Sequence, residues 1–310
     1  MPPLDLVQRI GLREEEDPQR TYLESGLESR ELIEAHLPAD WTWAGKRVLD
    51  FGCGVGRVLR QFAPESEEAE FFGCDLDSAS IGWLQAHFSP PFEAFETTEA
   101  ASLPQEDGFF DLIYAFSVYT HFTDNWAAWL LEHHRVLAEG GILFATFLGE
   151  GMLEPLVGEK WDEDRIGMNP LMQGLSWDKG GPIAINSPWW IEAHWGRAFE
   201  MLKIVPRMRA DEPSHGLVVA RKKPVEVSAE ELTRLEPDEP REMRALRHHV
   251  EQLEAEALRL RAAQEAMEAG LKASRAEAQQ AHKVLDEMLN SRSWRITAPL
   301  RTRRQLRRRD

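Results

Sequence analysis

The sequence predicts an α/β protein whose mostly parallel sheet is followed by an α-helical coiled coil. Between residues 47 and 223, short apolar runs alternate with segments of helical periodicity, and the links between them are short. Such alternation is typical of right-handed βαβ units, which build a parallel sheet. A heptad repeat then spans residues 242–290, which exceeds the roughly three or four heptads that indicate a coiled coil.

The alternation begins after an N-terminal helical segment, residues 1–40. Within it, the spacing of Leu23, Leu27 and Leu32 predicts a helix over residues 20–37, which ends at Pro38. The elements expected next are a strand at 47–51, a helix at 55–63, a strand at 70–77, a helix at 78–88 and a weaker strand at 92–97.

The strongest apolar run, residues 109–118, predicts a buried strand. A helix at 124–137 follows it, with Thr123 or Asp124 as the N-cap. The pair Gly140–Gly141 is expected to stop this helix, and the next strand is then expected at 141–149.

Residues 150–186 interrupt the alternation, because they are rich in Gly, Pro, Met and Trp and have no clear period. A connection of this length inside a compact domain is usually functional. Regular patterning resumes with a helix over 187–199, capped by Ser187 with Pro188 at its first position. Two closing strands are expected at 200–208 and 215–223.

The C-terminal part has a different composition. Residues 224–241 are acidic and contain prolines, so we expect a linker there, after a domain that spans 41–223. The predicted a and d positions of the heptads are Met243, Leu246, Val250, Leu253, Ala257, Leu260, Gln264, Met267, Leu271, Ser274, Ala278, Ala281, Leu285 and Met288. This narrow apolar stripe predicts an oligomer, formed with a copy of the chain or with a partner. Gln264, Ser274 and Gly270 weaken the stripe, so a single charged helix with chance periodicity is the alternative.

The charge of the chain is unevenly distributed. Residues 291–310 carry eight arginines against one acid, a charge of +7, which leaves −24 on residues 1–290 out of the total of −17. The acidic body argues against a nucleic-acid partner, because affinity for phosphate chains comes mainly from Lys and Arg. The basic tail indicates a separate role.

The cysteines and the N-terminus predict a cytoplasmic protein. Cys53 and Cys74 are the two cysteines of the chain, which is too few for a disulfide framework of this size, and their spacing does not suit a metal site. The first residues lack the apolar core of a signal peptide, and no apolar stretch approaches the roughly 18 residues of a membrane span.

The stretch "VLDFGCGVGR", residues 48–57, places three glycines directly after an apolar run. Gly52, Gly54 and Gly56 follow Asp50 in a G-x-G-x-G pattern, whereas a dinucleotide loop has G-x-G-x-x-G. An acid at this point would repel a pyrophosphate but would suit a cationic group. The loop therefore favours a cofactor that has no phosphate and carries a positive charge near the turn.

A second acid, Asp75, ends the next predicted strand in "FFGCDLD". An acid at the tip of the second strand of such a sheet can accept both hydroxyls of a ribose. The two features together describe a nucleoside with a cationic substituent, and S-adenosylmethionine fits this description.

Four segments resemble class I S-adenosylmethionine-dependent methyltransferases: "VLDFGCGVGR", "FFGCDLD", "LPQEDGFFDLIYAFSVYTHF" and "LLEHHRVLAEGGILFATF". The resemblance extends over about residues 22–222 and implies a Rossmann-like, seven-stranded sheet of order 3-2-1-4-5-7-6 with the last strand antiparallel. It implies cofactor contacts by Asp50, Gly52, Gly54, Gly56, Asp75, Phe116 and Ser117. The family's acid after the third strand corresponds to Glu99, with Thr97 and Thr98 as alternatives.

His121, which follows the fourth predicted strand, is the candidate general base. A hydroxyl acceptor benefits from such a base, and the carboxyl edge of a parallel sheet is where ligands collect. A structural role for His121, such as capping the next helix, is equally open. Tyr119 or Glu150 could line the acceptor site instead, and His133 and His134 are expected to be structural or solvated.

The insertion, residues 150–186, is expected to form much of the acceptor site. Trp161 and Trp177 lie in it, and Trp189, Trp190 and Trp195 follow; Asp162, Asp164 and Asn186 are nearby hydroxyl-binding candidates. Aromatic faces suit sugar rings, although ordinary packing is the commoner role of tryptophan. The chain has no N-P-P-Y-type tetrad, and Cys53 lies within the glycine loop, which argues against methylation of nucleic-acid bases.

The end of the chain, "SRSWRITAPLRTRRQLRRR", resembles the C-termini of bacterial surface-polysaccharide enzymes, both glycosyltransferases and sugar methyltransferases. Its arginines suit an anionic membrane surface, at about 1 kcal/mol per residue near the headgroups, or an acidic partner in an assembly complex. The sequence thus predicts a bacterial methyltransferase that acts on a sugar hydroxyl of a glycan or glycolipid precursor. The alternatives are a small-molecule methyltransferase of secondary metabolism and a non-catalytic coiled-coil scaffold.

Overall fold

The computed structural model describes residues 1–9, 17–176 and 180–296. Trp177, one of the predicted acceptor-site tryptophans, and residues 297–310 of the predicted basic tail lie outside this range. The chain divides into two compact units, Met1–His249 and Val250–Asp310. Each unit is described by itself.

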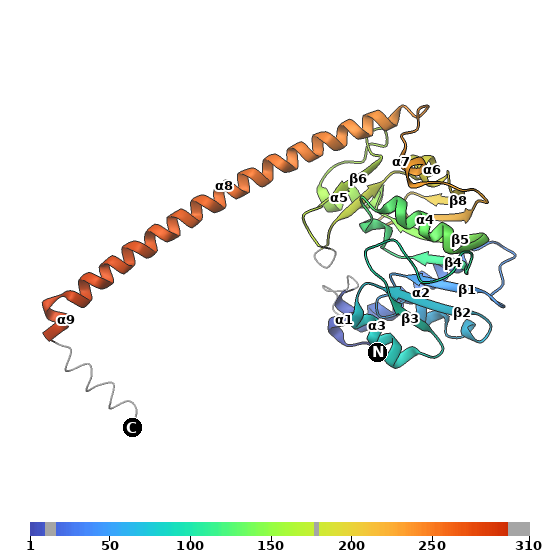
Figure 1. Ribbon diagram of the computed structural model, residues 1–310, viewed down its shortest axis with the longest axis horizontal. Helices are drawn as coiled ribbons and strands as arrows, with labels where there is room; N and C mark the ends of the chain where they lie inside the picture. The colour runs from blue at the N-terminus through green and yellow to red at the C-terminus, as the bar shows by residue number, and fades with distance from the viewer. Residues whose placement is uncertain (10–16, 177–179, 297–310) are drawn as a thin grey trace, which may run out of the picture. The chain divides into compact units, whose positions relative to one another are not determined.

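The first unit is built on a seven-stranded sheet with the order β3-β2-β1-β4-β5-β9-β8 (Figure 1). Its strands are β1 (Arg47–Phe51), β2 (Glu70–Asp75), β3 (Glu93–Glu96), β4 (Phe110–Ala115), β5 (Leu137–Phe147), β8 (Phe199–Val205) and β9 (Gly216–Lys222). Neighbours from β3 to β5 pair in parallel, and β9 is antiparallel to both β5 and β8. The predicted fold class and strand order are confirmed, since β8 and β9 are the sixth and seventh strands of this sheet.

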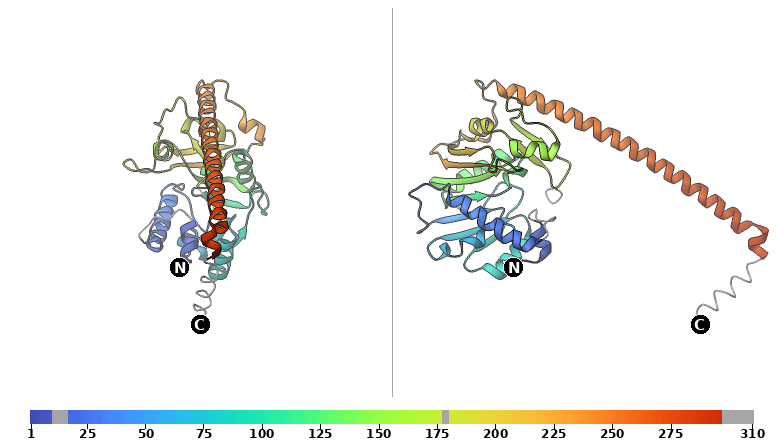
Figure 2. Two further views of the ribbon diagram at one scale, coloured as in Figure 1. Left: turned by 90° about the vertical axis from the view of Figure 1, so that its left-hand side faces the viewer. Right: turned by 180° about the vertical axis from the view of Figure 1, so that it is seen from behind.

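Helices cover both faces of the sheet. The helices of the first unit are α1 (Leu4–Arg9), α2 (Pro18–Glu34), α3 (Ser78–Phe88), α4 (Trp126–Val136), α5 (Glu150–Val157), α6 (Pro188–Trp195) and α7 (Ala229–Thr233). Side chains alternate between the faces of a strand, so Leu49 packs in one core with α4 and α6, whereas Val48 packs in another with α2. Helix α4 is in front in Figure 1, and α2 is in front in the view from behind in Figure 2.

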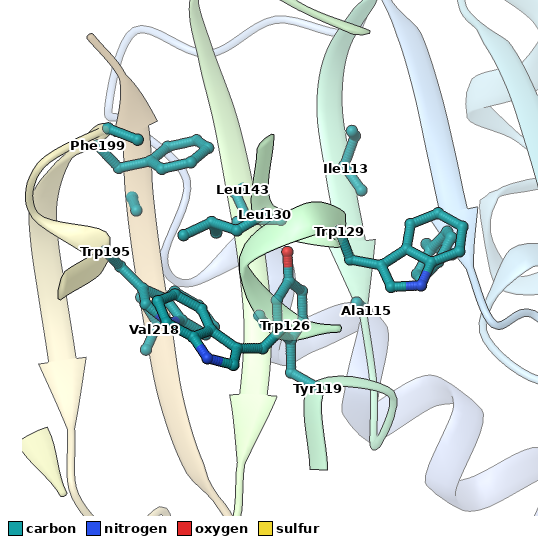
Figure 3. Packing of buried hydrophobic residues seen from close by; sticks show 14 of the residues in the cluster. Ile113, Ala115, Tyr119, Trp126, Trp129, Leu130, Leu143, Trp195, Phe199 and Val218 are labelled. Atoms are coloured by element: carbon teal, nitrogen blue, oxygen red, sulfur yellow. The ribbon is translucent and has the colours of Figure 1, made fainter. Parts of the chain in front are cut away.

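Figure 3 shows the core beneath α4. The side chains of Trp126, Trp129 and Leu130 project from α4 toward the sheet, and all three are buried. Tyr119 is also buried, and its hydroxyl lies 2.7 Å from Nδ1 of His133, whose pKa burial lowers to about 3. His133 is therefore structural, as predicted. Tyr119 is a buried core residue.

The segment after the glycine loop differs from its prediction. Residues 55–63 were expected to form a helix, but they form turns and a short 3₁₀ helix, η1 (Leu59–Phe62). The Tyr22 hydroxyl of α2 donates to the carbonyl oxygen of Val55 at 2.8 Å. This contact connects the turns to α2.

The predicted ends of α4 also require correction. Asn125 is the N-cap, in place of Thr123 or Asp124, and its side chain makes no capping hydrogen bond. The helix ends at Val136, because Leu137 is already extended, and β5 starts directly. The pair Gly140–Gly141 therefore lies inside β5 and does not stop the helix, and the positive φ of 71° at Gly140 marks a local distortion of that strand.

The stretch predicted as a linker, residues 224–241, contains a packed helix. Ser228 and Glu231 form a capping box at the start of α7, and Leu232 is fully buried. His194 of α6 lies with Nδ1 2.7 Å from the Leu232 carbonyl oxygen and Nε2 2.7 Å from Oε1 of buried Glu242. These two contacts hold the segment against α6.

The second unit consists mainly of the long helix α8 (Arg241–Asn290), whose first residues belong to the first unit, followed by α9 (Arg292–Ile296). Within the described part of the chain, no helix is long and apolar enough to cross a membrane. The predicted coiled coil thus corresponds to one continuous helix, and its pairing remains a prediction.

Candidate active site

The glycine loop joins β1 to the turns that follow. Gly52, Gly54 and Gly56 all have positive φ angles, of 78°, 50° and 73°, which favour glycine. A Cβ on Gly52 would lie 2.3 Å from Cγ2 of Val118, and one on Gly56 would lie 2.7 Å from Cδ2 of Leu84. The loop is therefore both sharply turned and closely packed, so a side chain at either position would displace its neighbours.

Asp50 lies in β1, two residues before the loop, and is almost completely buried. Its Oδ2 has no hydrogen-bond partner among the described residues. Burial raises the pKa of Asp50 to about 7, an effect that the charge of Arg57 opposes. A cation bound at the loop would stabilise the ionised carboxylate, so the site fits a positively charged ligand.

Asp75 ends β2 beside the glycine loop. Its Oδ2 accepts the Gly54 N–H at 2.7 Å, and its Oδ1 accepts the Asp77 N–H at 2.9 Å. Burial raises the pKa of Asp75, and these two backbone donors oppose the rise. Each carboxylate oxygen has a further lone pair, so Asp75 can still accept two ribose hydroxyls. The structure thus brings Asp50, the three glycines and Asp75 together at neighbouring strand ends.

The residues after β3 lie at different depths. Glu99 is exposed, whereas Thr97 is half-buried, and its Oγ1 has no partner among the described residues. The Thr97 N–H donates to the Asp75 carbonyl oxygen at 3.0 Å. Of the alternatives Glu99, Thr97 and Thr98, Thr97 is therefore the one whose backbone is hydrogen-bonded to Asp75.

The segment after β4 lies against the glycine loop through the contact of Val118 with Gly52. Ser117 has a φ of 58°, and its N–H donates to Oγ1 of Thr146 in β5 at 2.7 Å. The half-buried ring of Phe116 lies 6.0 Å from the Arg57 guanidinium. Phe116 and Ser117, both predicted to face the cofactor, thus lie on the edge of the sheet that carries the glycine loop.

His121 ends the short 3₁₀ helix η3 (Tyr119–His121), and its Nδ1 lies 2.8 Å from the carbonyl oxygen of Pro182. A carbonyl oxygen only accepts, so Nδ1 carries the proton. In the neutral ring, Nε2 then has the free lone pair that a general base requires. The contact also connects His121 to the insertion.

His215 lies at the same edge of the sheet, and the sequence did not single it out. It precedes β9, and its Nε2 lies 3.4 Å from Oγ of Ser117. Burial lowers the pKa of His215, and the charges of His121 and Arg57 lower it further. The antiparallel direction of β9 was the available signal, because the start of that strand meets the carboxyl ends of the parallel strands.

The insertion contains α5 and a two-stranded antiparallel sheet of β6 (Met168–Leu171) and β7 (Ile183–Asn186). It has its own apolar cluster, which includes Leu153, Ile166 and Ile185, with Trp161 packed against it. Asn186 is buried, whereas Glu150, Asp162 and Asp164 are exposed.

The tryptophans after the insertion are core residues and do not form a sugar-stacking surface. Trp189 donates through Nε1 to the Glu163 carbonyl oxygen at 2.9 Å, Trp190 stacks on His194, and Trp195 packs on Tyr119. All three tryptophans are buried. The expectation that they present faces to a sugar is therefore wrong for these three.

Residues 48–141 match a protein family described as "Methyltransferase domain". One curated relative is phthiotriol/phenolphthiotriol dimycocerosates methyltransferase 1 of Mycobacterium ulcerans, 29% identical over 47% of this chain and 49% of the relative. Another is the chloroplastic tocopherol O-methyltransferase of Arabidopsis thaliana, 30% identical over 36% of this chain and 34% of the relative. The chain thus spans half or less of the length of these relatives.

Among solved structures, an S-adenosylmethionine-dependent methyltransferase from Mesorhizobium loti aligns with a TM-score of 0.50 and 19% identity. The alignment covers 62% of this chain and 96% of that structure, which supports the shared fold. Residues 48–141 thus match a methyltransferase domain, and the first unit shares the fold of an S-adenosylmethionine-dependent methyltransferase.

Proposed function

We propose that this chain transfers a methyl group from S-adenosylmethionine to a hydroxyl, in a sugar of a glycan or glycolipid precursor. The observation that carries the choice of a hydroxyl is the orientation of His121. Its Nδ1 is occupied by the Pro182 carbonyl oxygen, and its Nε2 is left to accept a proton at the edge that bears the glycine loop. The name of the tocopherol O-methyltransferase supports an oxygen acceptor.

The residues that would hold the cofactor lie at the ends of β1, β2 and β4. Gly52, Gly54 and Gly56 hold the methionine part of the cofactor. Asp50, two residues before them, provides negative charge for its cationic group. Asp75 accepts the ribose hydroxyls. Glu99 or Thr97 lies on the adenine side, and Phe116 and Ser117 face the cofactor from the end of β4.

The bound cofactor supplies an activated methyl group on its sulfonium sulfur. The chain aligns the acceptor oxygen with the methyl and excludes water, since methyl transfer is an in-line displacement. As the O–C bond forms and the S–C bond breaks, Nε2 of His121 takes the hydroxyl proton. The products are the methyl ether, S-adenosylhomocysteine and a protonated His121.

Two classes of acceptor are candidates. Since Trp189, Trp190 and Trp195 are buried, the glycan assignment rests on the resemblance of the C-terminal tail. A second candidate is a small apolar molecule bearing a hydroxyl. It is favoured by the names of the dimycocerosates and tocopherol relatives and by the apolar side chains of the insertion, such as Met152 and Met172.

The proposal includes a cytoplasmic location, with the basic tail contacting the inner membrane or an assembly complex, and association of chains through α8. The alternative is a non-catalytic scaffold that keeps the methyltransferase fold. For such a scaffold we expect no binding of S-adenosylmethionine at high micromolar concentration in isothermal titration calorimetry.

The function is tested by mass spectrometry of cell-surface glycans with and without the gene. We expect loss of one methyl group from a glycan when the gene is absent. Unchanged glycans, together with transfer of labelled methyl to an apolar hydroxyl compound by the purified chain, would establish the second candidate instead.

Binding of S-adenosylmethionine is expected to depend on pH through Asp50. Because burial raises its pKa to about 7, Asp50 is protonated below that pH in the cofactor-free chain, with Arg57, Tyr114 and Asp75 as its charged or titratable neighbours. A bound cation favours the ionised form, so binding releases this proton. Affinity should therefore rise with pH, by up to about tenfold per pH unit below pH 7, and level off above it.

The variant Asp50→Asn removes this dependence, and Asp40→Asn, which changes an exposed carboxylate, retains it. The same shift affects stability. The folded chain binds more protons on Asp50 than the unfolded chain between the ordinary pKa of 3.8 and about 7, so stability falls as pH rises through this window. Isothermal titration calorimetry between pH 5.5 and 7.5 measures the pH dependence of cofactor binding. Equal pH slopes of affinity in Asp50→Asn and Asp40→Asn would rule out Asp50 as the titrating group.

A further inference from the structure

The long helix α8 carries an exposed apolar stripe. Its seam residues in the second unit include Leu253, Leu260, Met267, Leu271 and Leu285, and all of them are exposed in the single chain. The exposed fraction is 64% for Leu260 and 76% for Met267. A helix of this length with a bare apolar stripe gains most of its stability from packing against another surface.

We propose that a second copy of this chain covers the stripe, and that the two α8 helices form a parallel, in-register coiled coil. The repeat holds its period of seven from Met243 to Met288 without insertion, so one continuous seam serves two equal helices. The proposal concerns α8 alone and does not depend on methyl transfer.

Gln264 indicates the parallel orientation. It is a polar residue at an a position, and a parallel in-register pair sets it opposite its own counterpart. Its amide donates to Oε1 of Glu268 in the same helix at 3.1 Å, so its carbonyl oxygen is still able to accept from the facing amide. In a fully overlapped antiparallel pair, Gln264 would instead face the apolar side chain of Met267.

The charges beside the seam support the same register. In a parallel pair, a g residue lies near the e residue five positions later in the other helix. Glu256 then lies near Arg261, Glu277 near His282, and Val284 near Leu289.

The antiparallel pair has both favourable and unfavourable flanking contacts. It would bring Glu254 near Arg275 and Arg261 near Glu268, but it would also place Glu256 against Glu277. The parallel arrangement has no like-charged pair of this kind, and the self-pairing of Gln264 adds to its advantage.

Two leucines provide a matched test of the seam. Leu260 is a d residue, and Leu258, two positions earlier, lies off the seam at a b position, yet its exposed fraction of 66% is almost the same. We expect the full chain to sediment as a dimer. Leu260→Asp should raise the dissociation constant about 100-fold or more, because two carboxylates enter an apolar interface, whereas Leu258→Asp should leave it unchanged. A monomeric unaltered chain, or equal effects of both variants, would overturn the proposal.

Disulfide formation tests the orientation. Leu271→Cys at an a position should cross-link to itself under mild oxidation, whereas Ala276→Cys at the outer f position should not. The native thiols, Cys53 and Cys74, are buried and give little background. In an antiparallel pair Leu271 would face Leu260, so a mixture of differently tagged Leu271→Cys and Leu260→Cys chains would cross-link to each other. That result would contradict the parallel register.

Discussion

Asp75→Ala is expected to bind S-adenosylmethionine about 100-fold more weakly than the unaltered chain, or not measurably. In the proposed complex, Asp75 accepts two ribose hydroxyls, and hydrogen bonds to a charged acceptor contribute about 1.5–3 kcal/mol each. The same side chain accepts the Gly54 N–H at 2.7 Å, so its removal also releases the glycine loop. Isothermal titration calorimetry measures the change in affinity directly.

Asp77→Asn is the matched control for this variant. Asp77 is two residues away, and its Oδ2 accepts the Ser80 hydroxyl at 2.6 Å at the start of α3. The affinity of the Asp77→Asn chain for S-adenosylmethionine should stay within about threefold of that of the unaltered chain. Affinity of Asp75→Ala within the same range would show that the ribose is held elsewhere.

His121→Ala is expected to lower kcat about 100-fold or more while leaving the affinity for S-adenosylmethionine nearly unchanged. A positioned general base typically contributes a factor of about 10² to 10⁴, and His121 is proposed to touch the acceptor and not the cofactor. Steady-state kinetics with the identified acceptor, together with calorimetry on the same protein, separates the two effects.

Two comparisons make this result specific. His87→Ala alters an exposed histidine at the end of α3 and should keep full activity. His215→Ala tests the second imidazole of the edge, whose Nε2 lies 3.4 Å from Ser117 Oγ. If His121→Ala turned over at a near-normal rate while His215→Ala did not, the base would be His215 and the present assignment would be wrong.

The sheet could be predicted from the sequence because its strands are short apolar runs bounded by clear breaks. Residues 109–118 indicated β4 because they are apolar apart from Asp111 and Ser117, as expected for a strand buried on both faces. The glycine loop was equally readable, since three glycines directly after an apolar run indicate a sharp turn, and all three have positive φ angles. These features depend on local sequence, which is why they were visible without a structure.

The features that were missed depend on contacts between distant segments. The turns at residues 55–63 are held to α2 by the Tyr22 hydroxyl, which donates to the Val55 carbonyl oxygen. His215 reaches Ser117 across 98 positions of sequence, through the antiparallel pairing of β9 with β5. The chemical character of a tryptophan likewise does not tell whether it lines a site or, like Trp195, packs on Tyr119.

A crystal structure of this chain with S-adenosylhomocysteine tests the central claim most directly. The amino-acid end of the ligand should lie along Gly52, Gly54 and Gly56, and both ribose hydroxyls should lie within hydrogen-bonding distance of the Asp75 carboxylate. A ligand bound away from this loop, or a ribose that makes no contact with Asp75, would contradict the account.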